Sequence, residues 1–252
     1  MCIRDSPYDQ EFIDQKLNLC IDKIFRHDLC KQLNAIVTFS NDTVIFGQRT
    51  IRISNGIDFS SIPLRQQIHT MENELHLIGV AEIHFWHGFD RIINGLKEYY
   101  TQNPTYKVYF HIVGNLSGER ERQEIEMPIH TYGLSPYVIL HGAKHGKELD
   151  VLFEKADFAV GSLARHRSGI QNIKTLKNRE YAARGFGFIY SETDDDFEKM
   201  PYILKAPADE TPIEISKVIA FCKKQTTPPQ EIRDSIRNLS WKEQMKKVYD
   251  SI

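Results

Sequence analysis

The chain has 252 residues, a formal net charge of −2 and a hydrophobic share of 41%. These values allow one large domain or two small ones with a sizeable core, and the small net charge argues against nucleic acid as the main partner. The sequence shows no apolar run that could span a bilayer and no secretory signal, and its four cysteines lack metal-type spacing, so we expect a cytoplasmic protein with reduced thiols.

The first 60 residues predict one helix and two short strands. Residues 1–6 (MCIRDS) fit nothing that follows, and we expect them to be leader sequence outside the fold. A helix is predicted over 10–33, a short strand over 34–40, and a second strand over 50–58 that ends in an Asn-Gly turn. So few elements cannot close a sheet, and we therefore expect residues 7–60 to be the remnant of a domain whose beginning is absent.

From residue 75 onward, strand-like and helix-like segments alternate. Helices are predicted where apolar side chains recur at helical spacing, and strands where a short run is apolar or β-branched. The strands are expected at 75–81, 107–114, 137–142, 157–163, 186–191 and 202–208, and the helices at 89–100, at the start of 118–133, at 146–156 and at 175–185. This alternation predicts an α/β fold with a doubly wound parallel sheet at about 72–212.

The last forty or so residues predict two helices, 212–225 and 229–252, with prolines between them. Ser240 stands three residues before Glu243, which is the spacing of a capping box.

The segments that follow the strands are the candidates for a binding site, because ligands of open parallel sheets bind outside the carboxyl ends of the strands. Glycines there let backbone N–H groups approach a ligand, cations and helix N-termini favour phosphate, and a carboxylate accepts sugar hydroxyl protons. An anionic ligand with hydroxyl groups is therefore expected. The candidate residues are His87, Gly88, Gly114, Asn115, Arg165, His166, Arg167 and Glu180.

Several of these candidates have a structural alternative that the sequence leaves open. Gly88 and Gly114 also fit simple turns, and the basic run at 165–167 also fits a solvated loop. Glu180 also fits a charge on a helix surface, placed to complement the helix dipole at the N-terminal end.

Two histidine pairs raise the question of a metal. His84 and His87 are three residues apart, and His141 and His145 are four apart, but no cysteine or carboxylate completes either set. We therefore expect no metal site. The sequence also lacks a Gly-x-Ser-x-Gly elbow and a Walker loop, which argues against a hydrolase of that type and a P-loop enzyme.

Five segments stand in the order and spacing of a known family. They are 54–58 (SNGID), 80–96 (VAEIHFWHGFDRIINGL), 110–115 (FHIVGN), 138–162 and 176–191 (LKNREYAARGFGFIYS). Together they resemble the C-terminal, donor-binding half of a GT-B glycosyltransferase of the large retaining group, family 4, also called glycosyltransferases group 1. The first segment is similar to the Asn-Gly-(Val/Ile)-Asp that closes the acceptor-side domain, and the last to the region around the second glutamate of a Glu-x7-Glu motif.

The resemblance implies transfer of a hexose from a UDP- or GDP-linked donor to a glycan or lipid-linked acceptor, with retention at the anomeric carbon. It implies polysaccharide biosynthesis in the cytoplasm, leaves open association with the inner face of the membrane, and implies neither a metal nor a cofactor. It places a donor-binding domain at 72–212 and terminal helices at 213–252 that pack back towards the N-terminal domain.

Residue by residue, the resemblance assigns Glu180 to the donor ribose and lets Gly88 and Gly114 approach the donor closely. The first motif glutamate is replaced by Asn172, which would face the donor sugar or its phosphate. No catalytic residue is assigned.

The family's diphosphate-binding arginine and lysine are replaced by Glu82 and His87, so at these positions only a protonated His87 could serve. Arg165, His166, Arg167 or Lys177 are expected to substitute, with Arg167 and Lys177 favoured.

Two other functions stay open. Glu82 and Asn172 favour a non-catalytic protein that binds nucleotide sugars, and a sugar epimerase of GT-B type would use carboxylates from both domains. We expect the chain to be truncated at its N-terminus, so the activity of this piece alone is an open question.

Overall fold

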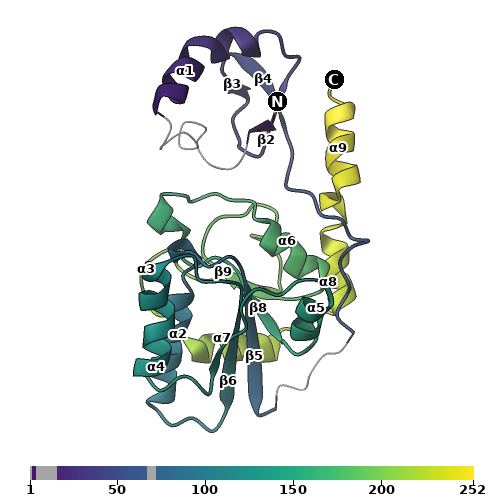
Figure 1. The fold of residues 1–252 in the computed structure, drawn as a ribbon. Helices are drawn as coiled ribbons and strands as arrows, with labels where there is room; N and C mark the ends of the chain where they lie inside the picture. Colours follow the sequence, from purple (N-terminus) through teal and green to yellow (C-terminus); the bar gives the residue numbers. More distant parts are fainter. Residues whose placement is uncertain (1, 4–15, 67–71) are drawn as a thin grey trace.

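The computed structural model describes residues 2–3, 16–66 and 72–252, which form a larger and a smaller unit (Figure 1). The larger unit is built on a six-stranded sheet in which all strands are parallel. Its strands are β5 (Glu74–Val80), β6 (Lys107–Val113), β7 (Val138–Leu140), β8 (Phe158–Val160), β9 (Phe188–Tyr190) and β10 (Ile203–Lys205). The α/β fold with a doubly wound parallel sheet is thus confirmed.

The strand order is β10-β9-β8-β5-β6-β7, which is the order of a Rossmann fold. The chain leaves β5 in one direction along the sheet and returns to start β8 on its other side, so the topological switch point lies between β5 and β8. Loops that follow these two strands meet at the carboxyl edge of the sheet.

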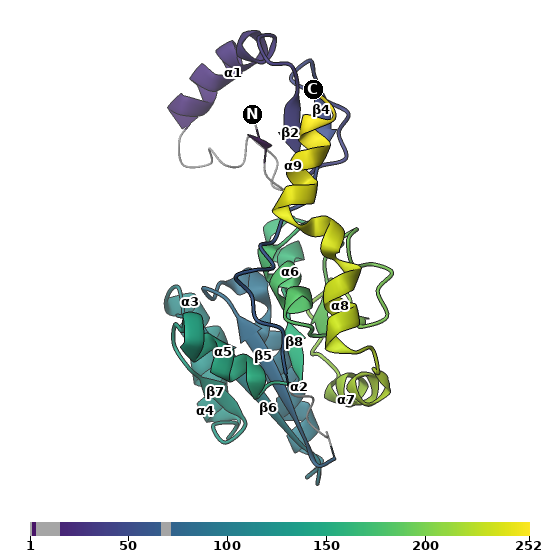
Figure 2. The ribbon, with the colours of Figure 1, turned by 90° about the vertical axis from the view of Figure 1, so that its right-hand side faces the viewer.

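Helices cover both faces of this sheet, which is why its strands read as nearly continuous apolar runs (Figures 1 and 2). One face packs against α2 (Phe89–Tyr100), the helical stretch α3 (Glu119–Glu121), Arg122–Glu126 and α4 (Met127–Thr131), and α7 (Ile215–Lys224). The other face packs against α5 (Gly146–Glu154), α6 (Leu176–Ala183) and α8 (Pro229–Ser235). Each element predicted from 75 to 225 is present, most of them shorter than predicted.

The smaller unit contains α1 (Lys16–Cys30) and a sheet of β1 (Cys2–Ile3), β2 (Ile36–Thr38), β4 (Gln48–Arg52) and β3 (Val44–Ile45), in that order. Two predictions fail here. The expectation that 1–6 lies outside the fold is wrong for Cys2–Ile3, which pairs with β2 in parallel. The β3–β4 hairpin was not predicted. Residues 10–15 of the predicted helix, and 4–6 of the expected leader, lie outside the described residues.

The predicted helix over 229–252 is broken into α8, a short turn Arg237–Leu239 and α9 (Trp241–Tyr249). The break follows from the capping residue, because the Ser240 hydroxyl accepts a hydrogen bond of 3.1 Å from the Glu243 N–H. Beyond this break α9 runs along the smaller unit (Figure 2). There the Ser54 N–H donates to Gln244 Oε1 over 2.7 Å, and Arg49 Nη2 donates to the Ser251 carbonyl over 3.0 Å.

A buried ion network joins the two units at the segment that connects them. Arg179 of α6 is fully buried and donates to both carboxylate oxygens of Asp194, over 2.6 and 3.1 Å. The same guanidinium also contacts Asp196, the Ser54 hydroxyl at 2.9 Å and the Asn55 carbonyl at 3.2 Å. Arg179 therefore binds the connector to the carboxyl edge of the large sheet.

Among the described residues, no helix combines the length and the apolar character that a membrane crossing requires.

Candidate functional site

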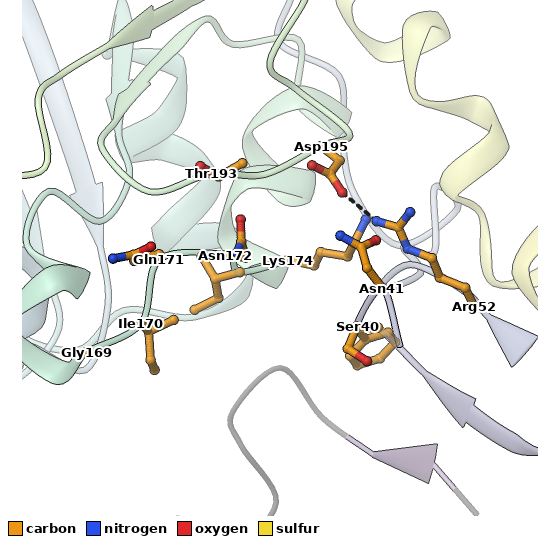
Figure 3. Close-up of a pocket in the computed structure, with 12 residues that line it drawn as sticks. Ser40, Asn41, Arg52, Gly169, Ile170, Gln171, Asn172, Lys174, Thr193 and Asp195 are labelled. Carbon is orange, nitrogen blue, oxygen red and sulfur yellow. Dashed lines mark hydrogen bonds and ion pairs between the residues drawn. The ribbon is translucent and has the colours of Figure 1, made fainter. Parts of the chain in front are cut away.

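A cavity of about 390 Å³ lies between the two units, beside the carboxyl edge of the large sheet (Figure 3). An ion pair between Arg52 and Asp195 crosses it from one unit to the other. Five of the other lining residues have neutral polar side chains, Phe39 adds an aromatic surface and Lys174 a charge, so the cavity suits a ligand rich in hydroxyl groups. The lining residues are Phe39, Ser40, Asn41, Arg52, 169–174, Thr193 and Asp195.

Asn172 is the predicted site residue that lines this cavity. Its backbone pairs with Thr193 in a short parallel bridge, in which the Ile173 N–H donates to the Thr193 carbonyl over 2.9 Å and the Thr193 N–H donates to the Gln171 carbonyl over 2.8 Å. This bridge fixes the loop after β8 against the loop after β9. The Asn172 side chain is exposed to the cavity, as a role towards a bound sugar requires.

Lys177 lies in the first turn of α6, which follows the cavity-lining residues 169–174 in the chain. Its Nζ is buried, makes no hydrogen bond to any described residue, and lies 5.7 Å from the centre of the Phe89 ring. Burial, and then the neighbouring charge of Arg165, lower the pKa of Lys177 to about 7, while Glu192 acts in the opposite direction. A buried ammonium group without a hydrogen-bond partner at the carboxyl edge of a Rossmann sheet is a candidate partner for an anionic ligand.

Glu192 is the residue that the sequence analysis missed. It is only 2% exposed, and neither carboxylate oxygen has a hydrogen-bond partner among the described residues. Burial raises the pKa of Glu192 to about 7 against the opposing effects of its own backbone N–H and of the charges of Lys177 and Arg165. It follows β9 directly, the same position relative to a strand that marked the other candidates, but a glutamate after a strand is usually an exposed side chain.

His87 is not the cation that was considered for this site. The ring is buried, and its Nδ1 accepts a hydrogen bond of 3.0 Å from the His84 N–H. Burial, followed by the charges of Lys177 and Arg165, holds the pKa of His87 far below its usual range. The suggestion that a protonated His87 could replace the family's lysine is therefore wrong, because the ring stays neutral.

Arg167 was favoured for ligand charge, but the protein itself occupies it. Its two Nη atoms bind both Asp90 oxygens over 2.9 and 2.8 Å, its Nε binds Glu210 over 3.0 Å, and Nη1 also reaches the Phe85 carbonyl over 2.9 Å. His166 Nε2 lies 2.6 Å from the same Glu210. The preference for Arg167 is thus corrected, since every guanidinium nitrogen already has a partner.

The remaining basic residue of this loop, Arg165, lies beside Lys177 and Glu192, with its guanidinium 5.4 Å from the centre of the Trp86 ring. Lys177 and Arg165 together form the positive part of the candidate site.

Glu180 does not begin its helix. Helix α6 starts at Leu176 after the capping residue Thr175, so Glu180 is the fifth of eight helical residues. Its carboxylate accepts a hydrogen bond of 2.9 Å from Arg184 Nε, and Arg184 also binds Asp150 over 2.7 Å. The expectation that the helix N-terminus stabilises this charge is wrong, because Arg184 balances it. The role towards a ribose stays a prediction.

Three further candidates have a clear packing role. A Cβ on Gly88 would lie 2.9 Å from Leu163, and a Cβ on Gly114 would lie 1.6 Å from the Ala81 carbonyl oxygen. The Asn115 side chain accepts a hydrogen bond of 3.3 Å from the Ala143 N–H. These contacts explain the residues by the fold alone, and their approach to a donor stays a prediction.

Gly88→Ala is expected to lower the free energy of unfolding by about 1–2 kcal/mol more than Gly133→Ala does. Both glycines have left-handed backbones, with φ of 66° and 67°, so alanine strains both alike. Only Gly88 has neighbours in the space that the new methyl group enters, while Gly133 has none within 4 Å. Urea unfolding of the two variants measures the difference, and equal losses would show that the Leu163 contact is unimportant.

The histidine pairs do not come together as metal ligands. His84 stacks on Trp86, whereas His141 belongs to a chain of imidazoles in which His141 and His111, and then His111 and His76, are joined at 2.9 Å between ring nitrogens. Within residues 2–3, 16–66 and 72–252, no group of three histidine, cysteine, aspartate or glutamate side chains is arranged to hold a metal ion.

The chain was compared with protein families, curated sequences and solved structures, and only solved structures match it. No protein-family model matches the chain, and no curated protein sequence matches it significantly. Among solved structures, sucrose-phosphate synthase from Thermosynechococcus elongatus matches with a TM-score of 0.65 and 15% identity, covering 90% of this chain and 60% of that one. A glycosyltransferase from Rickettsia africae matches with a TM-score of 0.69 and 13% identity, over 92% of this chain and 65% of that one.

HepE from Anabaena in complex with UDP-glucose matches with a TM-score of 0.67 and 16% identity, over 99% of this chain and 70% of that one. The larger unit has the Rossmann-like fold of GT-B glycosyltransferases. The chain spans 60% and 65% of the length of the first two structures. Lys177 and the cavity that Asn172 lines both lie at the carboxyl edge of the large sheet.

Proposed function

We propose that the protein is a glycosyltransferase that takes a sugar from a UDP- or GDP-linked donor. The observation that carries this proposal is the buried, unpartnered Lys177 Nζ beside Arg165 at the switch point of a Rossmann sheet. Two cations next to the first turn of α6 suit a diphosphate, because helix N-termini and ammonium groups both favour phosphate oxygens. The GT-B fold supports the same assignment.

In this proposal Lys177 and Arg165 hold the diphosphate, and Glu180 accepts hydroxyl protons from the ribose. Asn172 extends from the same edge into the cavity, where it would bind the donor sugar. We propose that these cations, and no divalent metal, balance the charge of the leaving nucleotide.

The smaller unit would supply the acceptor side. Phe39, Ser40 and Asn41 face Asn172 across the cavity, and amide, hydroxyl and aromatic groups are the usual partners of a saccharide. We propose a glycan or lipid-linked acceptor, a hexose as the transferred group, and retention at the anomeric carbon, as the sequence resemblance implies.

Glu180→Gln is expected to weaken UDP or GDP binding by about 1–2 kcal/mol, because a neutral amide accepts hydroxyl protons less strongly than a carboxylate does. Calorimetry should be run on wild type and variant, each with the nucleotide and with its 2′,3′-dideoxy analogue. The two losses should not add, since both changes remove the same contact.

Additive losses would exclude a contact between Glu180 and the ribose. Glu148→Gln, an exposed glutamate on α5, is the matched control and should bind nucleotide like the wild type. Absence of binding by UDP and GDP would overturn the proposed function itself.

A second candidate function is nucleotide-sugar binding without transfer. It is favoured by Asn172, an amide that cannot act as a general acid or base, at the position where the family has a glutamate. Slow release of the sugar from UDP-glucose or GDP-mannose by the purified protein would argue for the enzyme, and stable binding without any turnover would argue for the binding protein.

A further inference from the structure

The charges around Lys177 do not balance once a diphosphate is present. Arg165 is a cation, and Lys177, whose pKa is about 7, becomes one when a bound anion raises that pKa, while His87 stays neutral because burial lowers its pKa. Each phosphate of a nucleotide-sugar diphosphate carries one negative charge, so the two cations match the ligand alone. An ionised Glu192 would then leave one uncompensated negative charge in a buried site, which is costly.

Glu192 differs from the other acidic side chains near it. Asp194, on the same loop, is bound by Arg179, and Glu198 accepts hydrogen bonds from Lys205 Nζ over 2.8 Å and from the Tyr190 hydroxyl over 2.9 Å. Lys205 of β10 approaches Glu192 only at its backbone carbonyl.

Apart from its own backbone N–H, the Glu192 carboxylate therefore depends on the charges of Lys177 from α6 and Arg165 from the loop after β8, without a hydrogen bond from any other described residue. A ligand that engages those two cations removes what stabilises the ionised form.

We propose that Glu192 takes up a proton from solvent when a diphosphate binds at Lys177 and Arg165, and that the neutral carboxyl group then donates a hydrogen bond to the ligand. This inference rests on the proposed function and adds a residue to the donor site. A protonated carboxyl group is a donor, whereas a carboxylate only accepts, so the same side chain changes from repelling a phosphate oxygen to binding it.

Protonation of Glu192 costs little free energy near neutral pH, because its pKa in the free protein is already close to 7. Burial already raises the pKa of Glu192 to about 7, and a neighbouring anion raises it further. Below about pH 7 the free protein already holds the proton, so binding takes up none. Above that pH each binding event draws a proton from solvent, so affinity falls as pH rises, by up to about tenfold per pH unit for one proton.

Lys177, whose pKa is lowered to about 7, changes in the same direction when an anion binds. Proton counting alone therefore cannot assign the proton to Glu192, and a measurement on the carboxyl group itself is needed.

The experiment uses the full chain with UDP, GDP and inorganic pyrophosphate as probes, between pH 7.5 and 8.5, where their terminal phosphates are largely ionised. Calorimetry in HEPES and in Tris, which differ in ionisation enthalpy, counts the protons taken up. Infrared difference spectra recorded on addition of the probe show the C=O band of a protonated carboxyl group if one forms. We expect net proton uptake and a positive carboxyl band in the wild type.

The variant Glu192→Gln is expected to lose the carboxyl band and to bind UDP several-fold more tightly than wild type at pH 8.5, because its amide is neutral at every pH. Glu198→Gln, the neighbouring carboxylate with its own partners, should keep the band.

Binding of a probe without proton uptake or without the band in wild type would overturn this inference and leave the proposed function standing. Weaker binding by Glu192→Gln at all pH values would also overturn it, because Glu192 would then act as an ionised partner of Lys177. Absence of binding by all three probes would overturn both.

Discussion

Arg179→Met is expected to lower the free energy of unfolding by about 3–5 kcal/mol, the usual cost of removing one partner from a buried ion pair. The guanidinium is completely buried and binds both oxygens of Asp194, whose pKa is raised by burial in spite of the nearby arginine. Without it, Asp194, Asp196 and the Ser54 hydroxyl lose their shared donor. Urea unfolding followed by tryptophan fluorescence measures the loss.

Two further variants make this test specific. Arg52→Met removes an ion pair whose side chains are 45% and 49% exposed, and it should cost less than about 1 kcal/mol. The double variant Arg179→Met/Asp194→Leu should recover part of the lost stability, because it removes the unpaired carboxylate as well. An Arg179→Met protein as stable as Arg52→Met would show that the network contributes little.

Lys177→Met is expected to weaken UDP or GDP binding by about 1.5–3 kcal/mol, the range for a hydrogen bond to a charged group, which corresponds to roughly 10- to 150-fold in Kd. Methionine keeps most of the length and apolar stem of lysine. The fold should not suffer, because the lysine Nζ has no hydrogen-bond partner in the described part of the chain, and Glu192, which loses a neighbouring cation, can hold its proton instead. Calorimetry and urea unfolding on the same preparation separate the two effects.

The matched control is Lys147→Met, an exposed lysine on α5 that should bind nucleotide like the wild type. Unchanged binding by Lys177→Met would remove Lys177 from the donor site. A stable variant that binds nothing would show that the charge acts on the ligand and does not support the fold.

Much of the larger unit could be predicted from local patterns. The apolar spacing of 89–100 gives the bounds of α2, and each strand from β5 to β10 lies within a predicted apolar run or one residue from it. The smaller features could not be predicted. The β3–β4 hairpin has a strand of only two residues. Its turn has Phe46 in a left-handed backbone conformation, which the sequence does not predict for a phenylalanine.

The site was predicted less well, because the sequence shows which side chains are charged but not which ion-pair partners they have in the fold. The partners of Arg167 are 77 and 43 residues away in sequence, so its occupation by Asp90 and Glu210 is visible only in three dimensions. Glu192 was missed for the converse reason. A residue type that is rarely buried suggests a surface position, and only packing shows that it lies beside Lys177.

The contact between Ser54 and Gln244 spans 190 residues of chain, and it has a consequence for how the protein is made. Translation delivers residues 16–66 before α9, so the smaller unit leaves the ribosome before Gln244 and Val248 can reach their places. Domains tend to fold as units while they emerge, N-terminal segments first. The contacts between α9 and the smaller unit can therefore form only after Gln244 has been made, and the large sheet, whose strands all precede α9 in the chain, can be complete before then.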